Sequence, residues 1–149
     1  MENADRVRAN TAEEINRQID RDIEIRVREY SHRTESEITR RINELEREWD
    51  IERLLETNAS LLAFTGLVLG ITRNRKWLMV PGIVLPFLFQ HAIQGWCPPV
   101  PILRRLGVRT RDEINREKYA LKALRGDFDE INSMRRPEEA EDALEAVKA

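Results

Sequence analysis

Residues 54–96 read LLETNASLLAFTGLVLGITRNRKWLMVPGIVLPFLFQHAIQGW, a largely apolar region in an otherwise highly charged chain. Two apolar segments, 54–72 with about 19 residues and 77–96 with about 20, are joined by a short basic link at 73–76. An α-helix needs about 20 mostly apolar residues to cross the hydrocarbon layer of a bilayer. Because the link is so short, the two helices must return on each other. The sequence therefore predicts an all-α membrane protein built on a two-helix transmembrane hairpin.

Two tryptophans, Trp77 and Trp96, mark the ends of the second segment. They stand 19 positions apart in the sequence. That spacing is about 28 Å along an α-helix, which matches the thickness of the hydrocarbon layer. Tryptophan and basic side chains collect where membrane helices meet water. We therefore expect the membrane-interface anchors to be Trp77, Trp96, Arg73, Arg75 and Lys76.

Small residues share one face of the first segment. Ala59, Ala63, Gly66 and Gly70 are three or four positions apart, and the last two form a GxxxG motif. Helix contacts in lipid depend on close van der Waals approach, which small residues permit. This face is predicted to pack against the second segment or against another protomer. The alternative is that membrane helices simply contain more glycine.

Charge is divided unevenly along the chain. Between residues 54 and 101 only four residues are formally charged, although 35% of the whole chain is charged. A single globular domain would spread its apolar residues along every element. The net charge is −2 and the basic residues are interleaved with acids, so no nucleic-acid partner is expected. Residues 127–149 are expected to form an acidic tail with a short helix at 138–148.

The region 1–53 is predicted to form a long, charged, amphipathic helix resembling a coiled coil, starting at a Thr11 capping box and continuing to Thr57. Neither Gly nor Pro interrupts it. Its apolar residues recur with a period near the 11-residue repeat. A polar helix with a narrow apolar seam gains stability mainly by packing that seam. Either the helix self-associates as a bundle or stalk, or it breaks near Ser31 and His32 and folds back on its own chain. The predicted association seam is Ile15, Ile19, Ile23, Val27, Tyr30, Ile38, Ile42, Leu45 and Trp49.

The region 97–126 follows the hairpin and begins with the proline-rich sequence CPPVP. These prolines prevent continued helix and predict a stiff turn at the membrane interface. A capping box from Thr110 to Glu113 predicts a membrane-proximal helix. That helix should run to Arg125, with Gly126 as the residue that follows its C-terminus.

Cys97 is the one cysteine of the chain, so neither an intrachain disulfide nor a Cys-rich metal site is expected. A thiol near basic residues can have a lowered pKa and react. The alternative is a small apolar side chain at a helix end. Together with His91, Cys97 falls short of the four ligands of a structural zinc site. We expect no catalytic residues, cofactor or metal, and Cys97 is the candidate reactive thiol.

The motif Gly95-Trp96-Cys97-Pro98 follows the hairpin, and Leu106-Gly107 comes shortly after it. This combination resembles the YgaP-like transmembrane domain, a bacterial inner-membrane family, over roughly residues 51–110. The resemblance implies a two-helix hairpin that tends to dimerise. Some members carry a rhodanese domain that handles sulfur. No active-site cysteine loop of that domain is found here, so the resemblance does not bring sulfurtransferase activity with it. An apparent insertion between Cys97 and Gly107 also departs from the usual pattern.

These features predict a non-enzymatic integral membrane scaffold or accessory subunit. It would self-associate or attach to a larger membrane complex, such as a respiratory or photosynthetic one. Nine basic residues near the outer ends of the hairpin, against three in the link, place both termini on the cytoplasmic side. The resemblance implies that the membrane is a bacterial inner membrane. A monotopic hairpin inserted from one leaflet is the alternative topology. The alternative functions are a membrane-surface redox or sulfur-handling protein using Cys97, and a soluble helical interaction protein.

Overall fold

The computed structural model describes residues 6–128 of the 149-residue chain, and every regular element in that range is helical. The prediction of an all-α fold is confirmed. The chain divides into two compact units, each described here by itself. The first holds the described residues up to Arg21 together with Trp49–Ile114. The second holds Asp22–Glu48 and the described residues from Asn115 onward.

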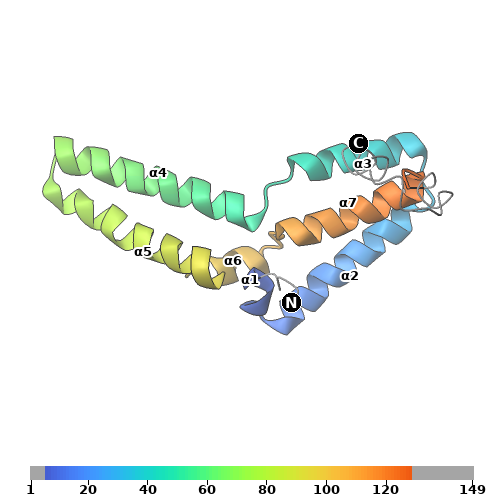
Figure 1. The fold of residues 1–149 in the computed structure, drawn as a ribbon, viewed down its shortest axis with the longest axis horizontal. Coiled ribbons are helices and arrows are strands. Elements are labelled where there is room, and N and C mark those ends of the chain that lie inside the picture. Colours follow the sequence, from blue (N-terminus) through green and yellow to red (C-terminus); the bar gives the residue numbers. More distant parts are fainter. Residues whose placement is uncertain (1–5, 129–149) are drawn as a thin grey trace, which may run out of the picture. The chain divides into compact units, whose positions relative to one another are not determined.

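The first unit is built around an antiparallel helix hairpin (Figure 1). Helix α4 (Ile51–Thr72) leads through the 3-10 helix η1 (Arg75–Leu78) into α5 (Met79–Gln94), and the two long helices pack along their length. Helix α4 therefore ends where the sequence predicts the first apolar segment to end. Its start is fixed by the Asp50 side chain, which accepts a hydrogen bond from the Arg53 amide at 2.7 Å.

A small apolar core lies at the open end of the hairpin, where α4 begins and α5 ends. Helices α1 (Arg6–Ala9) and α6 (Val100–Arg105) lie at this end. Half-buried Leu103 and Val108 pack against the core. The buried apolar residues hold the N-terminal segment and the proline-rich turn against the start of α4. They are Val7, Ile51, Leu55, Cys97 and Val100.

The second unit contains α3 (Glu35–Arg47) and the parts of α2 (Glu13–Tyr30) and α7 (Arg111–Arg125) that belong to it. Figure 1 shows α7 running between the other two helices of this unit. The fully buried Glu117 of α7 accepts hydrogen bonds from Arg26 at 3.1 Å and from Arg41 at 2.9 Å. Around this ion cluster the apolar interior of the unit comprises Ile23, Ile38, Ile42, Leu45 and Leu121.

The predicted continuous N-terminal helix is wrong, because α2 ends at Tyr30 and α3 begins only at Glu35. Thr34 adopts an extended backbone and forms a capping box with Glu37, which starts a new helix. This outcome matches the alternative of a helix broken near Ser31 and folded back on its own chain. Helix α2 also begins at Glu13 rather than directly after the predicted Thr11 cap. The Thr11 hydroxyl donates to the Val7 carbonyl at 2.7 Å.

The predicted helix after Thr110 is confirmed. The Thr110 amide donates to the Glu113 carboxylate at 2.9 Å, as a capping box requires. Helix α7 then runs to Arg125, and Gly126 follows in the left-handed region at φ +90°. The expected acidic tail and its short helix lie almost wholly outside the described residues.

Candidate functional site

The outer surface of the α4–α5 hairpin is a belt of exposed large apolar side chains. Two helical stretches, ending at Thr72 and Gln94, are long and apolar enough to cross a membrane. Only 17% and 6% of their most apolar windows is buried. A core helix of a water-soluble protein would be mostly buried instead. The belt includes Leu61, Leu62, Phe64, Leu67, Val68, Ile71, Met79, Ile83, Leu85, Phe87, Phe89 and Ile93.

The small residues of α4 lie on the face that meets η1 and the start of α5. Gly66 and Gly70 are buried, whereas Ala59 and Ala63 are half-buried. A Cβ added at Gly66 would lie 2.6 Å from Pro81 Cδ and 2.8 Å from Val80 Cβ. At Gly70 it would lie 2.5 Å from Leu78 Cδ2. The sequence allows this face to pack against the second segment or against another protomer. In the structure Gly66 and Gly70 pack against the second segment of the same hairpin.

The predicted interface anchors lie at the two ends of the hairpin. Trp77 lies in η1 at the closed end and exposes 44% of its surface, and the three basic residues of the link are also exposed. Trp96 follows α5 at the open end and is half-buried. The basic residues are Arg73, Arg75 and Lys76.

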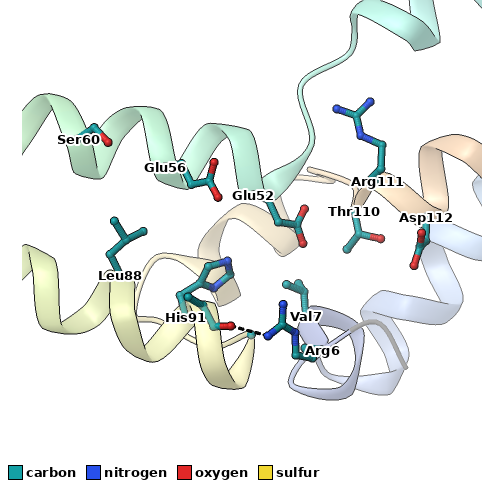
Figure 2. A pocket seen from close by; sticks show the side chains of 12 residues that line it. Arg6, Val7, Glu52, Glu56, Ser60, Leu88, His91, Thr110, Arg111 and Asp112 are labelled. Atoms are coloured by element: carbon teal, nitrogen blue, oxygen red, sulfur yellow. Dashed lines mark hydrogen bonds between the residues drawn. The ribbon is translucent and has the colours of Figure 1, made fainter. Parts of the chain in front are cut away.

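A cavity of about 840 Å³ opens between the two hairpin helices at their open end (Figure 2). His91 of α5 is only 7% exposed, and its Nδ1 has no hydrogen-bond partner among the described residues. Figure 2 shows its ring directed toward Glu52 and Glu56 of α4. The cavity is lined by Arg6, Val7, Glu52, Glu56, Ser60, Leu88, His91, Ala92, Gly95, Thr110, Arg111 and Asp112.

Charged groups of both signs face this cavity. The Arg6 guanidinium donates to the Ala92 carbonyl in the last turn of α5, where main-chain acceptors lack helical partners. Arg111 forms an ion pair with Asp50 at 2.5 Å, so it connects the start of α7 with the cap of α4. Three of the lining residues carry carboxylates and two carry guanidinium groups. The cavity therefore offers acceptors and donors together.

A buried ion network stabilises the same unit. Arg104 and Glu113 have no exposed side-chain surface and form a two-pronged pair with distances of 2.6 and 2.7 Å. Arg8 donates to Glu113 at 2.5 Å and also pairs with Asp20 at 2.8 Å. Arg104 donates further to the Asn16 side chain at 2.9 Å. The network connects four segments that are distant in sequence.

The charge state of Glu113 depends on this network. Burial by itself would raise the pKa of Glu113, but hydrogen bonds from Arg104 and from the Thr110 amide lower it below the usual value. A carboxylate with a lowered native-state pKa stabilises the fold above its unfolded-state pKa, which is about 4.3. That stabilisation is lost as the pH falls through the native-state pKa.

We therefore expect the thermal unfolding midpoint to fall steeply below about pH 4. The measurement is circular dichroism of the detergent-solubilised protein between pH 7 and pH 3. In Glu113→Gln the midpoint should start lower at pH 7 and fall less on acidification, because the variant has no proton to gain there. Equal pH dependence of the two proteins would show that other groups control acid unfolding.

Most of the predicted association seam is covered within the chain. Five of its residues are buried, namely Ile19, Ile23, Ile38, Ile42 and Leu45. Ile15, Val27 and Tyr30 are half-buried. Trp49, in the loop that connects α3 to α4 in the sequence, departs from this pattern because it is 44% exposed. The Arg53 guanidinium lies 4.6 Å from the centre of its ring. Self-association along the seam stays a prediction, because the fold buries most of the seam without a second copy.

Cys97 lies in the apolar core at the open end of the hairpin and is 5% exposed. Burial raises the pKa of its thiol, which favours the unreactive protonated form at neutral pH. This environment suits the alternative given above, in which Cys97 is a small apolar side chain at a helix end. Its role as a reactive thiol stays a prediction. Within residues 6–128 no three His, Cys, Asp or Glu side chains gather in an arrangement that could hold a metal ion.

Comparison of the chain with protein-family models, with curated proteins and with solved structures finds no match. The resemblance to the YgaP-like transmembrane domain therefore stays a prediction based on the motif after the hairpin.

Proposed function

We propose that this protein is a non-enzymatic membrane scaffold or accessory subunit, anchored in a lipid bilayer by the α4–α5 hairpin. The observation that supports the proposal best is the exposed apolar belt on both hairpin helices. Water-soluble monomers rarely expose contiguous apolar patches larger than a few hundred Å². A bilayer would cover all sides of the hairpin at once.

The polar groups within the hairpin are compatible with lipid. Main-chain groups in a bilayer must find partners inside their own segment, which helices provide. The Asn58 side chain donates to the Leu54 carbonyl at 2.7 Å, and the Thr72 hydroxyl donates to the Val68 carbonyl at 2.7 Å. The Thr72 hydroxyl and one of the two N–H groups of the Asn58 amide are thus paired on the same helix, so lipid contact would not leave these two donors unpaired.

Outside the hairpin, the second unit supplies the surface on which a scaffold would act. Its own interior is packed and its buried Glu117 is paired with arginines on two helices. Exposed apolar side chains remain at Ile25, Tyr119 and Leu124. Such residues give a larger membrane complex, or a second copy of the chain, places to contact. The proposed location is the bacterial inner membrane, with both termini on the cytoplasmic side.

The first test is extraction. Carbonate-washed membranes should retain the protein, and detergent should release it, because the exposed belt is apolar on all sides. Replacing Phe64, Leu67 and Ile71 together by Asp should abolish stable retention, since charge in the hydrocarbon layer is costly. Recovery of the unaltered protein in the carbonate supernatant would contradict the proposal.

The topology is tested by labelling with a membrane-impermeant maleimide in a Cys97→Ser background. Asn74→Cys in the link should be labelled in intact spheroplasts if the hairpin spans the membrane. Ser36→Cys, an exposed position on α3, is the matched control and should be labelled only after lysis. Protection of both positions until lysis would identify the monotopic topology instead.

A further inference from the structure

We propose that the cavity at the open end of the hairpin binds the headgroup of a phospholipid that carries a primary ammonium group, as in phosphatidylethanolamine. The proposal rests on the membrane anchoring proposed above. In this arrangement the ammonium faces Glu52 and Glu56, and the phosphate faces Arg6 and His91. The acyl chains continue along the apolar surface of α4 and α5.

The acidic side of the cavity suits a cationic group. Glu52 and Glu56 lie one turn apart on α4, so both carboxylates face the same space, as Figure 2 shows. Carboxylates outnumber guanidinium groups in the lining. None of the described lining residues is Phe, Tyr or Trp, so the aromatic cage that suits quaternary ammonium groups is missing. A primary ammonium, with three N–H donors, suits two carboxylates better.

The opposite side of the cavity carries hydrogen-bonding groups that suit a phosphate. His91 is more than nine-tenths buried, and its Nδ1 has no partner among the described residues although it faces the cavity. A buried polar atom left unpaired is costly, so a ligand that pairs with it is favoured. Arg6 contacts main-chain carbonyls through one nitrogen, Nη1. Because a guanidinium has five N–H donors, Arg6 keeps donors for a phosphate oxygen.

The position of the cavity identifies the source of the ligand as a lipid. Leu88 and Ala92 line it from α5, and the exposed Phe89 and Ile93 continue the apolar surface beside them. The cavity lies at the end of the hairpin where a bilayer changes from hydrocarbon to headgroups. Its volume of about 840 Å³ is within the usual range for small-molecule sites.

The test is lipid retention. The full-length protein is solubilised in detergent with an equimolar mixture of dioleoyl phosphatidylethanolamine, phosphatidylglycerol and phosphatidylcholine, and bound lipid is identified by native mass spectrometry. We expect phosphatidylethanolamine to be retained about tenfold over the other two, as for one good charge-assisted hydrogen bond. Glu56→Gln should remove this preference. Glu14→Gln, which deletes the same charge at an exposed position outside the cavity, should keep it.

Three outcomes would overturn the proposal. One is equal retention of the three lipids by the unaltered protein, and another is an unchanged preference in Glu56→Gln. The third is displacement by equimolar glycerophosphoethanolamine, which has no acyl chains and would assign the site to a soluble ligand. Flotation with vesicles of phosphatidylcholine alone separates this proposal from membrane anchoring. Flotation without lipid preference would leave the anchor intact and remove only the headgroup site.

Discussion

Replacing Glu113 by alanine is expected to lower the free energy of unfolding by about 3–5 kcal/mol. The substitution leaves the fully buried Arg104 without its carboxylate and removes an acceptor of Arg8. It also removes the acceptor of the Thr110 amide at the start of α7. The measurement is thermal or denaturant unfolding of the detergent-solubilised protein, followed by helical circular dichroism.

The matched control is Glu24→Ala on the exposed face of α2. Glu24 pairs with Arg28 at 4.0 Å, and both side chains are more than two-thirds exposed. Exposed pairs of this kind contribute little, so the loss should stay within about 0.5 kcal/mol. The double variant Arg104→Met with Glu113→Leu should lose less than the single Glu113→Ala, because it leaves no uncompensated charge on Arg104. If Glu113→Ala lost less than about 1 kcal/mol, the network would not be what stabilises this unit.

Replacing Gly66 by alanine is expected to destabilise the hairpin by about 1–3 kcal/mol, the range for overpacking in a close-packed contact. The new methyl group would lie 2.6 Å from a carbon of the rigid Pro81 ring and 3.1 Å from the Trp77 carbonyl oxygen. Neither atom is the end of a flexible side chain, so α4 and α5 must move apart. Unfolding midpoints in detergent measure the loss directly.

Gly82→Ala makes the identical chemical change in the same hairpin. A Cβ at Gly82 meets nothing within 4 Å and its backbone is helical. Because glycine inside a helix costs roughly 0.5–1 kcal/mol relative to alanine, this variant should be neutral or more stable than the unaltered protein. Only Gly66→Ala should thus lower the stability of the hairpin. Equal effects at the two positions would show that Gly66 is not a packing residue.

Elements whose ends carry local signals could be predicted from the sequence. Helix α7 begins at a capping box and ends before a glycine at positive φ, and both signals are visible in the residues themselves. The break before α3 carries the same kind of signal, Thr34 followed three positions later by Glu37. The apolar stripe obscured it, because α2 and α3 both direct apolar residues into the interior and the spacing therefore continues across the turn.

The candidate site could be predicted only in part. The polarity of His91 inside an apolar segment is visible in the sequence, and so is the spacing of Glu52 and Glu56. Their meeting with Arg6 and Arg111 depends on how four segments distant in sequence come together at one end of the hairpin. Neither hydrophobic periodicity nor a local motif predicts that these side chains line one cavity, because their proximity arises from tertiary packing.

The contacts of the N-terminal segment determine the order in which the polypeptide can finish folding. Arg6 contacts the Ala92 carbonyl, 86 positions later, and Arg8 contacts Glu113, 105 positions later. The ribosome releases residues 6–8 long before those partners exist. Residues 6–8 can therefore reach their native positions only after α5 and α7 have been synthesised. Helix α1 is thus one of the last described elements of the first unit that can reach its native position.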